Sequence, residues 1–368
     1  MRITFVLPHA GLAGGIRVAA LHARELHKRG HEVTAVSLPR RRPDLKSRMR
    51  QFLRMGAWPV TQPEAPGHFA DVPFEHRVID TYRPITADDV PDADVVIGTW
   101  WETATWINDY PASKGAKVHF IQHDETQFDH HEEDYRERVE ATWKLPMHRI
   151  VVAGWIKDLA AARYGVSDVT IVSNGVDTDM FNAPPRTKSW PPKVGVMYAT
   201  SHFKGTDISL EAVRLARQGF PRLQFVAFGA HQPMDELPVP HPAEFHVAPE
   251  QDKLREIYAS CDAWLFGSRS EGFGLPVLEA MACRTPVIGT PTGIAPDVLT
   301  NDAGIFVKPQ DPLDMAKAIE RVCRMTDAEW KRMSDKAYAI ARKHTWGRSY
   351  DAFEIELEKA AAGKVVAA

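Results

Sequence analysis

The strongest constraint on the fold is an alternation of short apolar runs with helical segments, which occurs twice along the chain. In the first half, runs typical of buried strands occur at 3–7, 32–38, 94–98, 117–122, 149–152 and 169–172. In the second half, such runs occur at 194–198, 223–228, 263–266, 286–288 and 304–307. Because helical patterns fall between most of these runs, we expect an α/β protein with two parallel sheets covered on both faces.

A proline-rich segment separates the two series. Four prolines occur among the twelve residues 182–193, and such a density cannot sustain a helix or a central strand. The length of 368 residues is also enough for two or three domains of about 150 residues each. We therefore expect a first domain over 1–183, a linker over 184–192 and a second domain over 193–344.

The composition excludes several classes of protein. A net charge of −3 provides no general basic field for nucleic acid, and no apolar run is long enough to span a membrane. Cys261, Cys283 and Cys323 have neither paired nor metal-type spacing, so we expect buried thiols in a reducing compartment. Residues 1–8 read as a strand rather than a signal peptide, and we expect a cytoplasmic protein.

The segment 270–280 carries the most chemistry. Glu271 precedes a Gly-Phe-Gly turn, and Glu279 follows on an expected helix with Pro276 in its first turn. A helix N-terminus offers free N–H donors to an anion, and a carboxylate can accept hydrogen bonds from a vicinal diol. Together these groups indicate a site for a nucleotide sugar. The competing interpretation is a pair of solvated carboxylates beside a turn.

This segment resembles the E-x7-E signature of retaining glycosyltransferases with the GT-B fold. Its continuation through Cys283 and Ile288, and the segment 173–181, are similar to glycosyltransferase family 4, also called group 1. Gly14-Gly15 and Lys204-Gly205 fit the same family in the same order. The resemblance implies two Rossmann-like domains facing a central crevice, with the first on the acceptor side and the second binding the nucleotide sugar.

The resemblance also implies that the last helix crosses back to the first domain. Residues 345–360 read as an amphipathic helix that Thr345 caps. Its apolar stripe consists of Trp346, Tyr350, Phe353 and Leu357. The sequence alone shows only that this stripe must pack against another surface.

Three residues are expected to be catalytic, by resemblance to the family. Lys204 would neutralise charge on the departing diphosphate, Glu271 would hold the donor sugar, and His123 at a strand end would touch that sugar. The family usually has an arginine a few residues before this lysine, and none is present here, so His202, Ser201 or a remote arginine would share the role. The alternatives are a solvated Lys204 at a helix start and a structural His123.

The donor-binding residues expected from the resemblance are Gly14, Gly15, Asn174, His202, Val247, Gly272, Phe273, Gly274, Leu275 and Glu279. The alternative for Gly14-Gly15 is a plain tight turn, and the alternative for Asn174 is a cap at the domain end. Arg284 stands where the family commonly has glycine, and it could reach nucleotide or acceptor. No metal or other cofactor is expected, because the histidines at 119, 123, 130 and 131 lack a ligand-type arrangement on one helix face.

The acceptor side is less determined. The segment Arg40–Arg54 carries seven basic residues and one acid, with apolar residues on one helical face. It reads either as a surface helix for anionic lipid, which would place the protein at the inner membrane face, or as a helix packed on its own domain. Trp100-Trp101 would either stack on an acceptor sugar or fill the core.

The function predicted is that of a retaining, metal-independent glycosyltransferase. It would move a sugar from a nucleoside-diphosphate sugar to a glycan, a lipid-linked acceptor or a small molecule. A nucleotide-sugar epimerase of GT-B shape and a non-catalytic nucleotide-sugar-binding protein remain alternatives. A dehydrogenase is disfavoured, because residues 11–15 do not form the Gly-x-Gly-x-x-Gly turn after the first strand.

Overall fold

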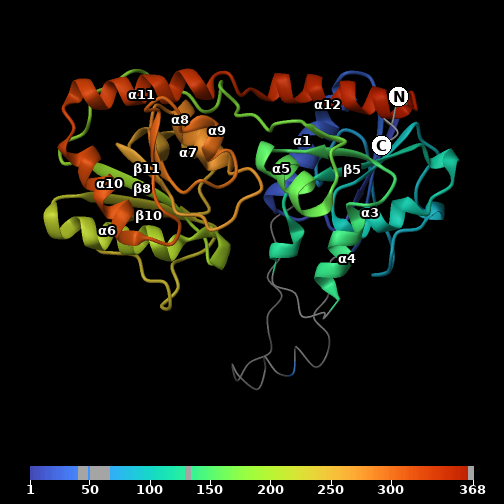
Figure 1. Cartoon of the computed structure of the whole chain (residues 1–368), viewed down its shortest axis with the longest axis horizontal. Coiled ribbons are helices and arrows are strands. Elements are labelled where there is room, and N and C mark those ends of the chain that lie inside the picture. Colours follow the sequence, from blue (N-terminus) through green and yellow to red (C-terminus); the bar gives the residue numbers. More distant parts are fainter. Residues whose placement is uncertain (40–48, 50–66, 129–133, 364–368) are drawn as a thin grey trace. The chain divides into compact units, whose positions relative to one another are not determined.

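The structure is a computed structural model that describes residues 1–39, 49, 67–128 and 134–363 (Figure 1). The chain divides into two compact units. The first contains Met1–Val151, Lys157–Thr170 and Tyr350–Ala368, and the second contains Val152–Ile156 and Ile171–Ser349. The basic segment Arg40–Arg54, except Met49, and residues 130–133 lie outside the described residues.

The first unit is a seven-stranded parallel sheet of order β3-β2-β1-β4-β5-β6-β7. Its strands are β1 (Arg2–Leu7), β2 (Glu32–Ser37), β3 (Glu75–Val78), β4 (Val95–Gly98), β5 (Ala116–Ile121), β6 (His148–Val151) and β7 (Val169–Ile171). Its helices are α1 (Gly14–Lys28), α3 (Trp101–Asn108), α4 (Tyr135–Thr142), most of α5 (Gly154–Tyr164) and most of α12 (Trp346–Ala361). In Figure 1, α1 and α12 cover one face of this sheet and α3 and α4 the other.

The C-terminal helix packs on the first unit, as expected. Phe353 on α12 is fully buried, and its ring lies 4.2 Å from that of His22 and 5.0 Å from that of Phe120. Arg29 at the end of α1 adds ion pairs of 2.6 Å to Glu354 and 2.7 Å to Asp351. The apolar stripe read from the sequence is therefore the face that α12 buries.

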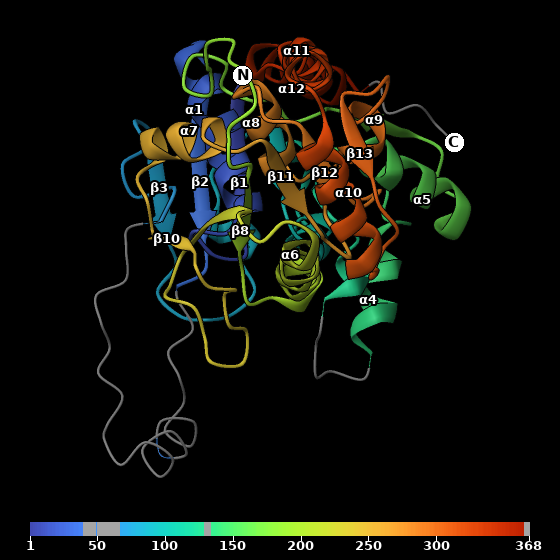
Figure 2. The same cartoon turned by 90° about the vertical axis from the view of Figure 1, so that its left-hand side faces the viewer.

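The second unit is a six-stranded parallel sheet of order β10-β9-β8-β11-β12-β13. Its strands are β8 (Lys193–Tyr198), β9 (Gln224–Gly229), β10 (Glu244–Val247), β11 (Ala263–Phe266), β12 (Val287–Gly289) and β13 (Gly304–Phe306). Its helices are α6 (Thr206–Gly219), α7 (Gln251–Ala259), α8 (Leu275–Ala282), α9 (Ala295–Val298), α10 (Pro312–Arg324) and α11 (Asp327–Ala341). Figure 2 shows α6 and α10 on one side of the sheet and α7 and α8 on the other. Both units thus have the expected parallel α/β architecture.

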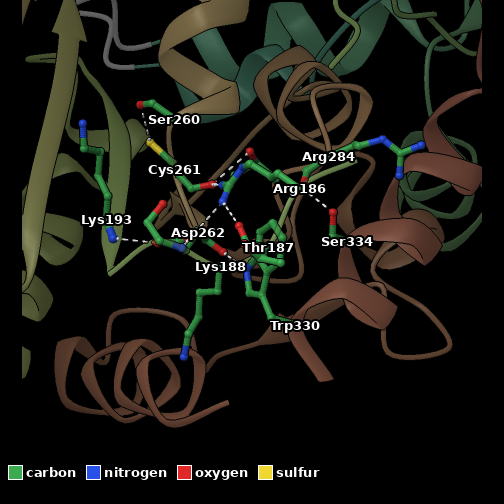
Figure 3. Close-up of polar contacts among 12 residues, drawn as sticks. Arg186, Thr187, Lys188, Lys193, Ser260, Cys261, Asp262, Arg284, Trp330 and Ser334 are labelled. Atoms are coloured by element: carbon green, nitrogen blue, oxygen red, sulfur yellow. Dashed lines mark hydrogen bonds and ion pairs between the residues drawn. The ribbon is translucent and has the colours of Figure 1, made fainter. Parts of the chain in front are cut away.

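The proline-rich segment is fastened to the second unit (Figure 3). Asp262 is fully buried, pairs with Arg186 at 2.8 Å and accepts hydrogen bonds from the backbone N–H groups of Ser189 and Lys193. The Arg186 guanidinium also lies 4.4 Å from the centre of the Trp330 ring. These contacts hold residues 186–193 against the second unit, whose main segment is Ile171–Ser349.

Arg284 is part of the same attachment and does not take up the ligand-binding role considered for it. Its Nε donates to the Ala183 carbonyl at 2.9 Å, its Nη1 pairs with Asp335 at 2.5 Å, and its guanidinium lies 3.9 Å from the Tyr338 ring centre. The residue has a φ of 61° just after α8. Its side chain therefore joins α8 and α11 to the segment that precedes the prolines.

Two further expectations concern the state of the cysteines and the presence of membrane-spanning helices. Cys261, Cys283 and Cys323 are free and buried, as expected, and burial raises the pKa of the Cys261 and Cys283 thiols to about 12. Across the ranges 1–39, 67–128 and 134–363, none of the helices is long and apolar enough to cross a bilayer.

Candidate functional site

The central feature of the candidate site is an ion pair between Lys204 and Glu271. The Lys204 Nζ donates to both Glu271 carboxylate oxygens at 2.9 Å, although the residues are 67 positions apart. The side chain of Glu271 is 7% exposed and that of Lys204 is 24% exposed. Lys204 is therefore a half-buried partner of the first signature glutamate rather than a solvated lysine.

Two strand ends bring this pair together. Lys204 closes a short 3-10 helix, η4 (His202–Lys204), after β8, and Glu271 lies in the loop after β11. Gly205, with a φ of 58°, allows the two loops to touch, because a Cβ there would lie 1.9 Å from the Gly267 carbonyl oxygen. Since β8 and β11 are neighbouring parallel strands, their carboxyl ends meet at one edge of the sheet.

Ser268 fixes the orientation of the Glu271 carboxylate. Its hydroxyl donates to Glu271 Oε1 at 2.8 Å, and the serine is 3% exposed. The Ser268 carbonyl in turn accepts a hydrogen bond of 2.6 Å from the Thr290 hydroxyl. Glu271 is thus held by a cation on one side and by a buried hydroxyl on the other.

Sequence reasoning missed Arg269, which holds the loop that carries Lys204. Its guanidinium pairs with Asp207 at 2.6 Å and donates to the His202 carbonyl at 2.8 Å. These bonds raise the pKa of Arg269 and lower that of Asp207. The signal in the sequence was the opposite charge of two residues that each lie within three positions of the Lys204–Glu271 pair.

The N-terminus of α8 lies four positions after Glu271, at Leu275. Gly274 has a φ of 86°, and this left-handed turn allows α8 to begin at Leu275 with Pro276 in its first turn, as expected. The loop is held in place by two backbone acceptors: the Gly272 carbonyl accepts from the Trp155 indole at 2.9 Å, and the Phe273 carbonyl accepts from the Ile294 N–H at 2.7 Å. A helix start of this kind can bind an anion beside the lysine.

Glu279 lies one turn into α8 and is 5% exposed. It accepts a hydrogen bond of 2.9 Å from the hydroxyl of Tyr258, which is fully buried. The two signature glutamates are therefore both buried in the second unit, and each accepts from a buried hydroxyl. This rules out the interpretation of two solvated carboxylates.

The other residues of the second unit that are expected to contact the donor differ in how exposed they are. Val247 ends the edge strand β10 and is 41% exposed, and His202 is exposed beside Lys204. Asn174 is 3% exposed, and its side-chain oxygen has no hydrogen-bond partner within the described part of the chain. Val176, two positions further on, pairs with Thr345 in a parallel bridge, so this stretch packs beside the start of α12.

The expected residues of the first unit gather at two neighbouring loops. Gln122, directly after β5, donates to the Gly15 carbonyl at 2.9 Å, and a Cβ on Gly15 would contact the same amide at 3.4 Å. A Cβ on Gly14 would meet open space. His123 follows Gln122, and its Nδ1 lies 3.0 Å from the Asp124 carbonyl, with the ring 4.8 Å from that of Phe128. The structure therefore brings Gly15 close to the strand end that carries His123.

Trp100 and Trp101 lie in different environments. Trp101 is 3% exposed and packs edge-on against Tyr135, so it fills the core, while Trp100 is half-buried against Phe128. The Trp101 backbone N–H donates to Glu125 at 2.8 Å. Burial raises the pKa of the Glu125 carboxyl well above its usual value.

Comparison with known families finds one match for each half of the chain. Residues 13–180 match Glycosyltransferase Family 4, and residues 182–340 match Glycosyl transferases group 1. The two matches follow in order and cover nearly all of both Rossmann-like units. The chain therefore belongs to the group 1 and family 4 glycosyltransferases with the GT-B fold, in agreement with the resemblance read from its motifs.

Individual curated relatives share less than a third of their aligned residues with this chain, and only over part of their length. Sulfoquinovosyl transferase SQD2 of Arabidopsis thaliana is 28% identical over 205 residues, which are 51% of this chain and 39% of that protein. D-inositol 3-phosphate glycosyltransferase of Stackebrandtia nassauensis is 27% identical over 209 residues, which are 50% of this chain and 47% of that protein. The chain spans about two fifths to one half of the length of the curated relatives that it matches.

The fold is shared over the full length of solved structures. Anabaena HepE in complex with UDP superposes with a TM-score of 0.73 at 15% identity, covering 98% of this chain and all of that one. Sucrose-phosphate synthase from Thermosynechococcus elongatus gives a TM-score of 0.72 at 16% identity, covering 99% of this chain and all of that one. At these identities the likeness establishes the fold alone.

Proposed function

We propose that this protein is a retaining glycosyltransferase that transfers a sugar from a nucleoside-diphosphate sugar to an acceptor hydroxyl without a metal ion. The observation that carries the proposal is the Lys204–Glu271 pair beside the N-terminus of α8, with Glu279 buried one turn further on. This arrangement offers a cation and backbone donors to a diphosphate, and it offers acceptors to sugar hydroxyls. The HepE neighbour, whose structure contains UDP, supports a nucleotide donor.

The diphosphate would lie between Lys204 and the backbone of 272–275. An ammonium has three N–H donors, of which two serve Glu271, so a third can reach a phosphate oxygen. As the bond from the sugar anomeric carbon to the phosphate oxygen breaks, negative charge grows on the diphosphate. A positioned lysine and helix N-terminus stabilise that charge more in the transition state than in the ground state.

In the proposed mechanism the acceptor attacks the sugar from the same face that the diphosphate leaves, and the diphosphate takes the acceptor proton. The acceptor oxygen bonds to the anomeric carbon on the face that the phosphate leaves, and the departing phosphate oxygen takes the acceptor proton. Glu271 would hold sugar hydroxyls, and Glu279 the ribose diol. The contributions of Gly14, Gly15 and His123 from the first unit, and of Asn174, His202 and Val247, stay predictions.

The first test is a donor screen. Thermal unfolding is followed with UDP, GDP, ADP, CDP and dTDP, because a ligand at a hundredfold excess over its Kd adds about 2.7 kcal/mol to the free energy of unfolding. The nucleotide that raises the melting temperature is then supplied as its sugar conjugates. Failure of all five nucleotides to shift the transition contradicts the proposed donor site.

The second test separates transfer from the alternatives. Release of free nucleotide is measured with and without glycan, lipid-linked and small-molecule acceptors, and the anomeric configuration of the product is read by NMR. A transferase releases nucleotide in step with acceptor, an epimerase changes the donor sugar without release, and a sensor does neither. Activity that persists in EDTA supports metal independence, whereas strong inhibition contradicts it.

A further inference from the structure

Tyr258 stands out because its hydroxyl group is buried in an aromatic environment. The residue lies near the end of α7 and is fully buried. Its ring centre lies 4.5 Å from that of Trp264, 5.8 Å from that of Phe228 and 6.0 Å from that of Phe181, each at a steep angle. Such edge-to-face contacts fix the ring of a buried aromatic residue.

The fixed ring directs its hydroxyl at one signature glutamate. The Tyr258 hydroxyl donates to Glu279 Oε2 at 2.9 Å, and the Thr285 hydroxyl donates to the Tyr258 carbonyl at 2.6 Å. Both the tyrosine and the glutamate are at least nine-tenths buried. Since a tyrosine hydroxyl is a single donor and an ionised carboxylate is only an acceptor, this bond sets which edge of the carboxylate is turned toward the aromatic cluster.

We propose that Tyr258 is a positioning residue that gives the nucleotide site its selectivity for a ribose diol. By engaging Oε2, it fixes the plane of the carboxylate that would receive the two adjacent hydroxyls of the ribose. A carboxylate with a fixed rotamer does not lose side-chain freedom again when the nucleotide binds, so the diol is recognised more strongly. This inference rests on the proposed function, because it assigns the ligand of Glu279.

The experiment compares Tyr258→Phe with the wild-type protein. Phenylalanine keeps the ring contacts with Trp264, Phe228 and Phe181 and removes only the donor. Isothermal titration measures the affinities for UDP and GDP and for their 2′,3′-dideoxy counterparts. The ratio of ribose to dideoxy affinity should fall about tenfold in Tyr258→Phe, as expected for a lost hydrogen bond to a charged group, while dideoxy binding stays within about twofold.

Two further variants make the test specific. Tyr110→Phe is the matched control, since it removes a similarly buried hydroxyl that donates to the Ile85 carbonyl of the first unit at 2.7 Å. It should leave the affinity ratio unchanged. Glu279→Gln should lose at least as much ribose preference as Tyr258→Phe. Adding Tyr258→Phe to it should cause no further loss, because Tyr258 acts only by positioning the carboxylate that Glu279→Gln has already removed.

The possible outcomes distinguish failure of the positioning role from failure of the proposed function. If neither nucleotide binds wild-type protein, the proposed function fails. If wild-type protein binds with a ribose preference that Tyr258→Phe retains, the positioning role is wrong and the proposed function stands. An equal loss of ribose and dideoxy affinity, or full additivity with Glu279→Gln, shows a purely structural tyrosine and also overturns the role.

Discussion

Replacing Lys204 with methionine tests the central ion pair most directly. The change removes both 2.9 Å hydrogen bonds to Glu271 and keeps an unbranched apolar stem. Breaking a buried pair typically costs about 3–5 kcal/mol, because it leaves an uncompensated charge. Here Lys204 is 24% exposed and Ser268 still donates to Glu271, so we expect a loss of about 2 kcal/mol in the free energy of unfolding.

The assay is denaturant unfolding of a variant series. Lys331→Met is the matched control, because Lys331 pairs with Asp335 at a surface where it is 48% exposed, and such pairs contribute at most about 1 kcal/mol. Adding Glu271→Gln to Lys204→Met should restore most of the lost stability, since the buried charge is then gone. This non-additivity is the signature of a direct pair.

The catalytic rate of Lys204→Met gives a second, independent test. If charge develops on the diphosphate mainly in the transition state, Lys204→Met lowers kcat more than it weakens donor binding. The reasoning is refuted if Lys204→Met unfolds at the control's midpoint and the double variant is additive. Near-normal kcat with only a raised KM would remove the catalytic role while leaving the ion pair intact.

Three further predictions concern other residues. Glu279→Ala should fold and bind nucleotide roughly 10- to 100-fold more weakly, and unchanged affinity by titration would contradict its ribose role. Burial lowers the pKa of His119 to about 3, so its contribution to stability is present above pH 6.5 and is lost as pH falls toward 3. His119→Phe should accordingly lose about 2 kcal/mol less than wild-type protein between pH 7 and pH 5, and equal losses in denaturant titrations would argue against this. If Arg40–Arg54 binds membranes, the protein should sediment with anionic but not with neutral vesicles at low salt. Changing Arg48, Arg50 and Arg54 to Glu should abolish this binding. Wild-type protein that stays in the supernatant would argue for a soluble acceptor.

The central strands, all of which sequence reasoning found, differ in burial from the two strands that it missed. Every central strand of both sheets is a mainly buried apolar run, and each was located within two residues of its bounds. The two missed strands, β3 and β10, lie at sheet edges and are largely exposed or half-buried. β3 and β10 cover little core, so their sequences need not be apolar, whereas the edge strands β7 and β13 keep apolar residues and were found.

Arg284 shows why a motif position can mislead. Its place after α8, where the family has glycine, suggested contact with a ligand. The left-handed turn at Arg284 instead directs the guanidinium to Ala183 and Asp335. Those partners lie 101 and 51 positions away, so only the packing of α11 and the proline-rich segment could identify them.

The sequence by itself determined the two-sheet α/β architecture, the position of α8 and the two signature glutamates, because periodicity, helix-start residues and a local motif are short-range properties. The tertiary structure alone decided which groups those glutamates contact. Lys204 and Tyr258 lie 67 and 21 positions from the glutamates that they contact, and they reach them from the loop after β8 and from α7. Hydrogen bonds between residues tens of positions apart depend on sheet order and on close backbone contacts such as that of Gly205 with Gly267, and no local pattern encodes these.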